Sequence, residues 1–297
     1  MIAVLPGRTP HPPPARDGEG SLLAGYDGSR EAASAIAVAA RLLPDRTARV
    51  VHLWNRPDAG SDLHRRLAAR ARTADDLTRR VEREVADVAR NIAAGGVALA
   101  RAAGWTAEPQ VAGVYGGEGL QLARLAEEMQ PAAVVVGSRG ERGVRALLRS
   151  VSTVTAKLSP VPVLVVPPLL AEERAATVAG PVLVAHDGSD GAERARAAAA
   201  ALFPGRTHLT AHVDASLPGA GTTATPPGAR ALRADGVGPR AVADALADEA
   251  AARGSGVIVV GSRGRSLVRE LLLGSVARAV LHHGHRPVLV VPPAGGA

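Results

Sequence analysis

The sequence predicts an α/β protein of two doubly wound, five-stranded parallel-sheet domains, paired about a pseudo-twofold axis. Asp27-Gly28-Ser29 recurs 160 residues later as Asp187-Gly188-Ser189, which indicates an internal repeat. Short apolar runs alternate with helical segments in both halves, as in a parallel sheet that carries helices on its faces. Both halves also end in the same Pro-Val-Leu-Val-Val run, at residues 162–166 and 287–291.

The strands of the first half are predicted from runs of apolar, often β-branched residues, which suit strands that are covered on both faces. Ser29 and Ser189 stand at the N-cap positions of the helices that follow the Asp-Gly-Ser turns. Pro44 and Pro204 stand where these helices are expected to end. The expected strands cover residues 22–26, 49–54, 109–114, 132–137 and 161–166.

The two halves differ in length. The glycine turns that begin at Gly137 and Gly261 are only 124 residues apart, so the second half has lost 36 residues between its landmarks. The lost segment corresponds to a long charged helix around residues 63–94. Residues 216–228, rich in Gly, Pro and Thr, take its place, and we therefore expect one crossover of the second half to be a loop.

These landmarks divide the chain into four parts. We expect a disordered or loosely ordered segment at residues 1–20, a first domain at 21–168 (the first half), a linker at 169–180 and a second domain at 181–297 (the second half). The last strand of each half is too apolar for an open sheet edge, so we expect these two strands to pair and make an internal pseudo-dimer. The alternative is that flanking prolines protect each edge separately. Assembly into a homodimer is a further possibility.

The composition narrows the class of partner. The chain has a formal net charge of +7, but its arginines are dispersed among Asp and Glu along helices, and only 2% of its residues are aromatic. This pattern favours solvated helix faces over a nucleic-acid groove. No apolar run approaches the ~18 residues of a membrane span, and residues 1–20 lack the apolar core of a secretory signal. We therefore expect a cytoplasmic protein without a membrane partner, and the lack of cysteine excludes disulfides and thiolate metal sites.

A glycine motif in the second half carries the main functional signal. The apolar strand at residues 257–260 runs into Gly261-Ser262-Arg263-Gly264, and Gly274-Ser275 follows after nine intervening residues. Glycines let backbone N–H groups approach an anion that a Cβ atom would hold off, and a helix that begins near Gly274 adds its positive end. The motif therefore predicts a phosphate site at the end of a strand.

The order of these landmarks resembles the universal stress protein family in its tandem form, over residues 21–293. An Asp-Gly-Ser turn, a strand that contains a histidine near its end, a glycine turn and a closing Pro-Val-Leu-Val-Val strand occur twice in the same order. The resemblance implies the Rossmann-like fold of the adenine-nucleotide α-hydrolase type. In one branch of the family it also implies ATP bound beside the glycine motif, whereas members without the motif do not bind ATP.

The resemblance further implies which residues of the second half hold ATP. Asp187 would face the adenine or the ribose, Val213 the adenine edge, and the Ser275 hydroxyl a phosphate oxygen or its associated Mg²⁺ ion. Arg263 is either a phosphate partner or a solvated loop residue. The implied nucleotide-binding residues are Asp187, Gly188, Val213, Gly261, Arg263, Gly264, Gly274, Ser275 and Val276.

The first half departs from this motif at one position. Alignment of the two closing strands places Arg149 where the second half has Gly274, and an arginine side chain there would occupy the phosphate space or pair with a phosphate in another geometry. We therefore expect a first-half site that is degraded, weakly binding or empty. The residues that keep a partial pocket are Asp27, Leu53, Gly137, Gly140 and Ser150.

Other chemistries fit the sequence less well. The only lysine, Lys157, follows Ala156, which excludes a P-loop. A phosphoacceptor role for Asp27 or Asp187 lacks an acidic companion. The cluster at residues 282–285, His-His-Gly-His, is interpreted as a solvated turn instead of a metal site, because no carboxylate is near it in the sequence. No catalytic residue is predicted.

Three functions are consistent with these residues. The first is an ATP-binding regulator of the stress response, whose occupancy shifts its conformation or its choice of an unidentified protein partner. The second is a slow Mg²⁺-dependent ATPase or nucleotide transferase. The third is a nucleotide-free interaction module in which both motifs are relics. The first is favoured because no catalytic base is visible in the sequence.

Overall fold

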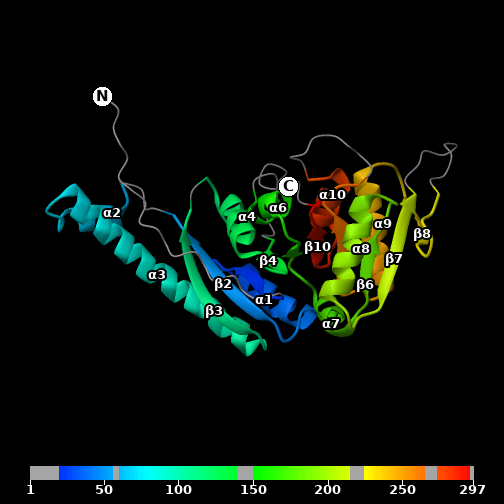
Figure 1. Ribbon diagram of the computed structural model, residues 1–297, viewed down its shortest axis with the longest axis horizontal. Coiled ribbons are helices and arrows are strands. Elements are labelled where there is room, and N and C mark those ends of the chain that lie inside the picture. Colours follow the sequence, from blue (N-terminus) through cyan, green and yellow to red (C-terminus); the bar gives the residue numbers. More distant parts are fainter. Residues whose placement is uncertain are drawn as a thin grey trace, which may run out of the picture.

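A computed structural model of the chain shows one ten-stranded sheet with helices on both faces (Figure 1). The structure describes residues 20–55, 60–114, 116–138, 150–214, 224–264 and 273–294. The expected N-terminal segment at residues 1–20 thus lies outside the described residues, apart from Gly20. Within the described ranges, no helix has both the length and the apolar character that crossing a bilayer requires.

The strands follow the order β3-β2-β1-β4-β5-β10-β9-β6-β7-β8, so each half contributes five neighbouring strands, in mirrored order. The strand pairs within each half are parallel. All five strands expected in the first half are present, with ends that shift by up to three residues. The strands are β1 (Leu22–Gly25), β2 (Thr47–Trp54), β3 (Thr106–Gly113), β4 (Ala133–Gly137), β5 (Val163–Val166), β6 (Val182–Ala185), β7 (His208–Asp214), β8 (Arg230–Arg233), β9 (Val257–Gly261) and β10 (Val288–Val291).

The closing strands of the two halves pair with each other, as the sequence predicts. Leu164 of β5 lies opposite Leu289 of β10 in an antiparallel ladder, and all residues of both strands are buried. Two apolar edges thus become the middle of one sheet, which removes the aggregation hazard that an open edge would present. The antiparallel direction of this pair relates the two halves by a pseudo-twofold axis.

The helices begin and end where the sequence signals indicate. The Ser29 hydroxyl accepts from the Ala32 N–H, and the Ser189 hydroxyl accepts from the Ala192 N–H, so both serines cap the helices that follow them. These two helices end shortly before the repeated prolines. The helices are α1 (Arg30–Leu42), α2 (Asp62–Ala68), α3 (Ala74–Ala102), α4 (Glu118–Met129), α6 (Val151–Leu158), α7 (Ala171–Ala179), α8 (Asp190–Leu202), α9 (Pro239–Ala252) and α10 (Ser275–His283).

Two apolar core clusters lie on opposite faces of the sheet, and each extends through both halves. One cluster includes Ile36 of α1, Val97 of α3 and Ala195 of α8. The other includes Leu122 of α4 and Leu246 of α9, together with residues of α6 and α10. Because successive strand residues point to alternate faces, the same short strands supply both clusters.

The halves differ most between their second and third strands. In the first half α3 makes this crossover and packs against β2 and β3. In the second half the described residues 224–229 before β8 contain no helix, and β8 itself is largely exposed. The expected loop at residues 216–228 falls mostly outside the described residues, which resume at residue 224.

The segment expected as a linker, residues 169–180, forms α7 and is packed between the halves. Glu173 of α7 makes a buried ion pair with Arg286, at 3.2 Å between Oε1 and Nη1. Arg206 donates to the carbonyl oxygens of Thr177 at 2.7 Å and Arg41 at 3.0 Å, so its guanidinium joins α7 to α1. These contacts pack the connecting segment against both halves.

Candidate functional site

Each half brings its two repeated turns together at one place in the sheet. β1 and β4 are neighbours in the first half, and β6 and β9 are neighbours in the second. At these pairs the order of the strands changes direction, because the first crossovers lead one way along the sheet and the later ones lead the other way. Crevices at the carboxyl ends of strands beside such switch points are where doubly wound sheets bind ligands.

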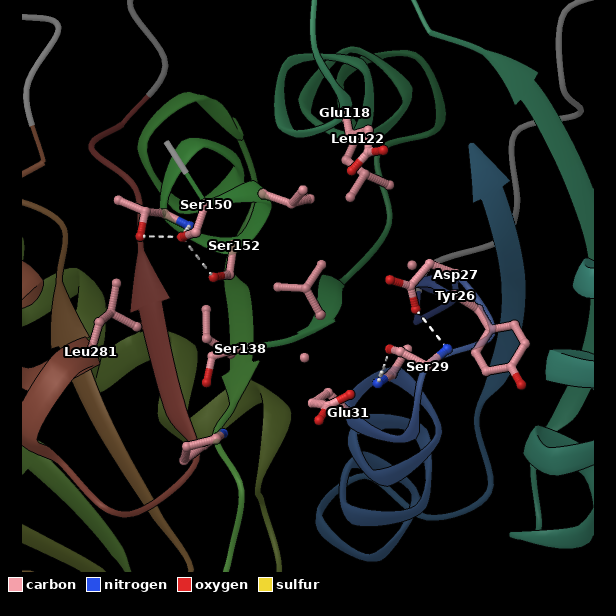
Figure 2. Close-up of a pocket in the computed structure, with 18 of the residues that line it drawn as sticks. Tyr26, Asp27, Ser29, Glu31, Glu118, Leu122, Ser138, Ser150, Ser152 and Leu281 are labelled. Carbon is pink, nitrogen blue, oxygen red and sulfur yellow. Dashed lines mark hydrogen bonds between the residues drawn. The ribbon is translucent and has the colours of Figure 1, made fainter. Parts of the chain in front are cut away.

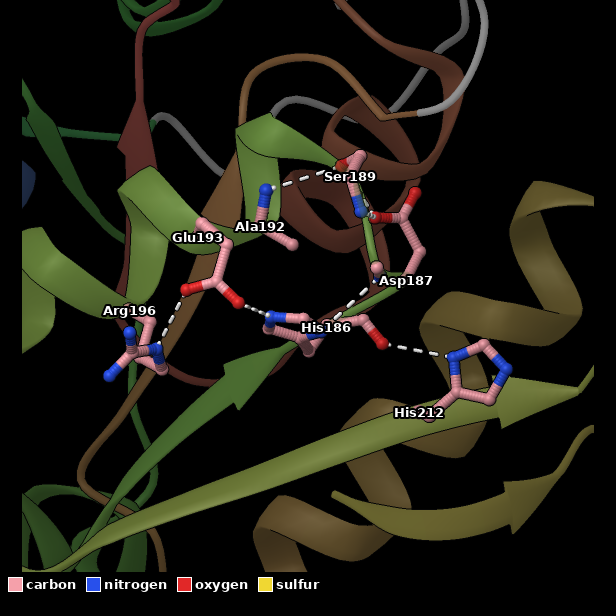
Figure 3. Close-up of polar contacts among 8 residues, drawn as sticks. His186, Asp187, Ser189, Ala192, Glu193, Arg196 and His212 are labelled. Atoms are coloured by element: carbon pink, nitrogen blue, oxygen red, sulfur yellow. Dashed lines mark hydrogen bonds and ion pairs between the residues drawn. The ribbon is translucent and has the colours of Figure 1, made fainter. Parts of the chain in front are cut away.

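In the second half the Asp-Gly-Ser turn is held by its own side chains (Figure 3). Oδ1 of Asp187 accepts from the backbone N–H of Ser189 at 3.0 Å and from its hydroxyl at 2.6 Å. Gly188 has a φ of +81°, a backbone conformation that favours glycine. The turn thereby fixes the position of the Asp187 carboxylate at the end of β6.

The glycines of the motif stand where backbone or carboxylate atoms leave no room for a Cβ atom. A Cβ atom on Gly264 would lie 2.5 Å from Oδ2 of Asp187, and one on Gly261 would lie 2.7 Å from the carbonyl oxygen of Gly191. A Cβ atom on Gly274 would lie 2.8 Å from the carbonyl oxygen of Ser262. The structure therefore brings Asp187 and all three motif glycines together at the ends of β6 and β9.

The two helices that follow the glycine turns begin differently. In the second half α10 begins at Ser275, and its N-cap residue is Gly274, whose N–H donates to the carbonyl oxygen of Ser262 at 2.7 Å. In the first half α6 begins at Val151, and the hydroxyl of its N-cap residue Ser150 accepts from the backbone N–H of Thr153. Glycine has no side-chain oxygen with which to do the same, so Gly274 leaves the first-turn N–H donors of α10 without a side-chain cap from the N-cap residue.

A polar network of His186, Glu193 and Arg196 contacts the second-half turn (Figure 3). Nδ1 of His186 accepts from the backbone N–H of Gly188 at 3.2 Å, so the ring proton is on Nε2, which donates to Oε1 of Glu193 at 3.0 Å. Arg196 donates to the other Glu193 oxygen at 2.9 Å. Hydrogen bonds from Arg196 and then from His186 lower the pKa of Glu193 from its usual value. The network ties the turn to the first two turns of α8.

The remaining predicted residues of the second half have less direct places in the site. The carbonyl oxygen of Arg263 packs against Gly191 at the start of α8. Val213 on β7 and Val276 in α10 are partly buried against the core cluster on the α9 and α10 face. Val276 is adjacent in sequence to Ser275 in the first turn of α10, beside the motif.

A cavity of about 760 Å³ lies at the switch point of the first half (Figure 2). Four of the five residues predicted there, Asp27, Leu53, Gly137 and Ser150, line it. The fifth, Gly140, lies outside the described residues, and so does Arg149. The volume falls in the range of small-molecule sites in proteins. The structure thus brings four of the five residues together around the partial pocket that the sequence predicts in the first half.

The cavity also contains polar residues that sequence reasoning missed. Glu118 of α4 and Thr153 of α6 line it, as do His282 and His285 from the second half. His282 lies in the last turn of α10 and His285 just beyond it, so the histidine cluster forms part of a cavity wall instead of a purely solvated turn. Partial burial lowers the pKa of His282, and the neighbouring His283 and Arg278 lower it further.

The histidine cluster does not gather metal ligands in the described part of the chain. No group of three or more His, Cys, Asp or Glu side chains that could hold a metal ion occurs among the described residues. The carboxylates that share the cavity with His282 are those of Asp27, Glu31 and Glu118, which come from the first half. The polar lining is therefore assembled from side chains that are distant in the sequence.

The fold and the strand-end turns define a Rossmann-like α/β protein with two such units in one chain. The model of the universal stress protein family matches residues 20–167 and 237–292, which is more than half of the sequence. The chain therefore belongs to the universal stress protein family.

Individual relatives match the chain to different extents. Universal stress protein Slr1101 of Synechocystis sp. is 58% identical over 38 residues, which cover 13% of this chain and 35% of that relative. The chain thus matches about a third of the length of this curated relative. A universal stress protein structure from Archaeoglobus fulgidus matches with a TM-score of 0.59 at 20% identity, over 92% of this chain and 96% of that one. A putative universal stress protein from Pseudomonas aeruginosa matches with a TM-score of 0.55 at 14% identity, over 92% and 93%. At these identities the two structures show that this chain shares their fold.

Proposed function

We propose that this universal stress protein binds ATP at the glycine motif of its second half. In this proposal it acts as a cytoplasmic, nucleotide-responsive regulator of the stress response, and a protein partner reads its occupancy. The two-part organisation at residues 21–168 and 181–297 gives each half its own switch point, and the proposal assigns the triphosphate to the second one.

The observation that carries the proposal is the start of α10. Its N-cap residue is Gly274, which has no side-chain oxygen, so backbone N–H donors at the positive end of the helix are available to an anion. Gly264 and Asp187 lie beside this helix end, and a Cβ atom on Gly264 would contact the carboxylate. Backbone N–H groups that no side chain covers can form a concave binding site for phosphate oxygens.

The residues present also fit a Mg²⁺ ion that accompanies the nucleotide. The Ser275 hydroxyl is the first side chain of α10 and would contact a phosphate oxygen or the ion. Asp187 is held in place by Ser189, and there it would accept a hydrogen bond from a ribose or adenine group. The bound ion would neutralise phosphate charge, and we propose binding instead of turnover as the function.

A titration of the full chain with ATP in the presence of Mg²⁺ tests this proposal. Gly274→Arg, which copies the first-half residue, would place a side chain 2.8 Å from the Ser262 carbonyl oxygen and over the helix end. We expect it to weaken ATP binding by at least about 100-fold, as for loss of several charge-assisted hydrogen bonds.

Gly205→Arg is the matched control, because it adds the same side chain where nothing lies within 4 Å. It should leave the affinity unchanged. Equal affinities for the wild type and Gly274→Arg would contradict an ATP site at the motif. ATP turnover that falls in Ser275→Ala while binding persists would instead support the enzyme alternative.

A further inference from the structure

The residue that precedes the second-half Asp-Gly-Ser turn is His186, and its imidazole ring is bonded at both nitrogens (Figure 3). Nδ1 accepts from the backbone N–H of Gly188 at 3.2 Å, and Nε2 donates to Oε1 of Glu193 at 3.0 Å. His186 is buried, whereas Glu193 is exposed in the first turn of α8. One buried ring thus connects the turn to a charged group on the neighbouring helix.

The first half has a different residue at each end of this connection. Tyr26 stands in the place of His186, and Ala33 stands in the place of Glu193. The tyrosine ring has no nitrogen that could accept from the glycine of its turn. It packs against α3 instead, where a Cβ atom on Gly96 would lie 2.6 Å from it. The polar ring therefore occurs in the half in which no described helix takes the place of α3.

The bond between the ring and Gly188 acts on Asp187, the carboxylate of the proposed ATP site. Asp187 lies between the two bonded residues, so its backbone is fixed as long as the ring accepts from the Gly188 N–H. Its side chain is held separately, because Oδ1 accepts from the backbone N–H and the hydroxyl of Ser189. Oδ2 lies beside Gly264 of the glycine motif. The backbone and the side chain of Asp187 are thus fixed by two different sets of hydrogen bonds.

The bond to Gly188 requires one protonation state of His186. An imidazole whose Nδ1 accepts a hydrogen bond is neutral, because the imidazolium ion carries a proton on both nitrogens. Protonation would set two N–H donors against each other at Nδ1, whereas the bond from Nε2 to the Glu193 carboxylate would strengthen. Hydrogen bonds from Arg196 and then from His186 lower the pKa of Glu193, so this carboxylate stays charged. The neutral ring therefore holds the turn, and the charged ring holds only α8.

Other ionisable residues lie on the elements around the ring. They are Asp187 in the turn, Asp190, Glu193, Arg194 and Arg196 on α8, His208, His212 and Asp214 on β7, and Arg263 after β9. Glu193 bonds the ring directly, and Arg196 acts on the ring through Glu193. His212 donates from Nδ1 to the carbonyl oxygen of His186 at 2.9 Å, and protonation of His212 leaves this donor in place. Protonation of His186 itself is thus the event that removes a bond from the turn.

We propose that His186 is a positioning residue of the second-half site, whose neutral ring holds the Asp-Gly-Ser turn for the nucleotide and whose protonation releases it. The affinity for ATP then falls as the pH falls. Glu193 sets the pH at which the affinity falls, because its negative charge favours the imidazolium form. This inference rests on the proposed ATP site and adds the regulation of that site by pH.

Two variants of similar size separate the acceptor from the rest of the ring. His186→Asn keeps an oxygen acceptor two residues before the Gly188 N–H, as in an Asx turn, and gains no proton in this pH range. His186→Leu has no acceptor. In titrations of the full chain with ATP and Mg²⁺ at about pH 8, we expect His186→Leu to bind about three- to tenfold more weakly than the wild type, as for the loss of one hydrogen bond. His186→Asn should bind within about twofold of the wild type.

The pH profile is the measurement that a merely structural role would not move. Between about pH 8 and about pH 5.5 the affinity of the wild type should approach that of His186→Leu, whereas His186→Asn should stay above both. Glu193→Gln keeps an oxygen acceptor for Nε2 without the charge, so its loss of affinity should occur at a lower pH than in the wild type. His64→Leu is the matched control in α2 of the first half and should follow the wild type. Titration of the nucleotide itself is common to all variants and cancels between them.

The ¹⁵N resonances of the His186 ring, recorded without nucleotide, give a second readout that needs no variant to fold. We expect a neutral ring with its proton on Nε2 at about pH 8, and a proton on Nδ1 instead would overturn the inference. Equal affinities of His186→Leu and the wild type at about pH 8, or equal pH profiles of His186→Asn and the wild type, would overturn it and leave the ATP site intact. A wild type that binds no ATP at any pH would contradict the proposed function and this inference together.

Discussion

The starts of α6 and α10 show how two copies of one fold come to present different chemistry. Both helices follow a glycine turn at a switch point, and both have a serine at their start. In α6 the serine is the N-cap residue Ser150, and its hydroxyl accepts a hydrogen bond from a backbone N–H group in the first turn of the same helix. In α10 the N-cap residue is Gly274 and Ser275 is already helical, so the helix donors are presented to the motif. The offset of one residue therefore decides whether a helix end is self-capped or available to a ligand.

The two halves also differ in the cavity and the turns that they contain. The first half has the cavity, and the second half completes its wall through the end of α10. The second half has the glycine motif, and its turn is fixed by a histidine and glutamate network in which His186 and Glu193 take the places of Tyr26 and Ala33 of the first half. Different residues thus hold equivalent turns in the two halves.

The largest expected effect on the free energy of unfolding concerns the residue that comes just before the closing strand of each half. The second half uses the buried ion pair between Glu173 and Arg286, whose side chains are only 10% and 8% exposed, whereas the first half has the apolar Val161 in the position of Arg286. Glu173→Gln leaves Arg286 buried beside a neutral group, and we expect a loss of about 3–5 kcal/mol in the free energy of unfolding, measured by urea denaturation.

The double variant Glu173→Met/Arg286→Met is the informative control. Replacing both partners by apolar side chains should recover most of the loss, because no charge then remains buried. A double variant as unstable as Glu173→Gln would show that the pair contributes more than the avoidance of an unpaired charge.

A smaller effect is expected in α3, the crossover helix of the first half. A Cβ atom on Gly96 would lie 2.6 Å from the ring of Tyr26 and 2.7 Å from Val50, so Gly96→Ala should cost about 1–3 kcal/mol through overpacking. The adjacent Gly95 has nothing within 4 Å, so Gly95→Ala should stabilise the helix by up to about 1 kcal/mol. Thermal unfolding of both variants measures the contrast. Equal shifts in the unfolding temperature of the two variants would mean that α3 does not pack closely against the sheet at Gly96.

Much of the fold was predictable because its signals are local. Ser29 and Ser189 cap helices, and the repeated prolines follow the ends of those helices, which needs only neighbouring residues. The pairing of β5 with β10 followed from the apolar character of two strand edges. The helix α7 inside the linker was not predicted, because it is stabilised by contacts with both halves, such as the ion pair of Glu173 with Arg286.

The candidate site was predictable only in part. Asp187 and the motif glycines come together because parallel strands end at the same edge of the sheet, so the repeated motifs were sufficient. The cluster with His282 and His285 was interpreted as a solvated turn because no carboxylate is near it in the sequence, whereas the carboxylates that share its cavity come from the first half. Their place depends on how the two halves dock, which is a tertiary property. Glu118 was missed for a similar reason, since only the packing of α4 brings it to the cavity.

In the proposed function the triphosphate binds to the second half, at the start of α10. A crystal structure of the full chain grown with ATP and Mg²⁺ tests this most directly. We expect triphosphate density at the start of α10, beside Gly264 and the Ser275 hydroxyl. Triphosphate density found only in the first-half cavity, between Ser138 and Ser150, would contradict it.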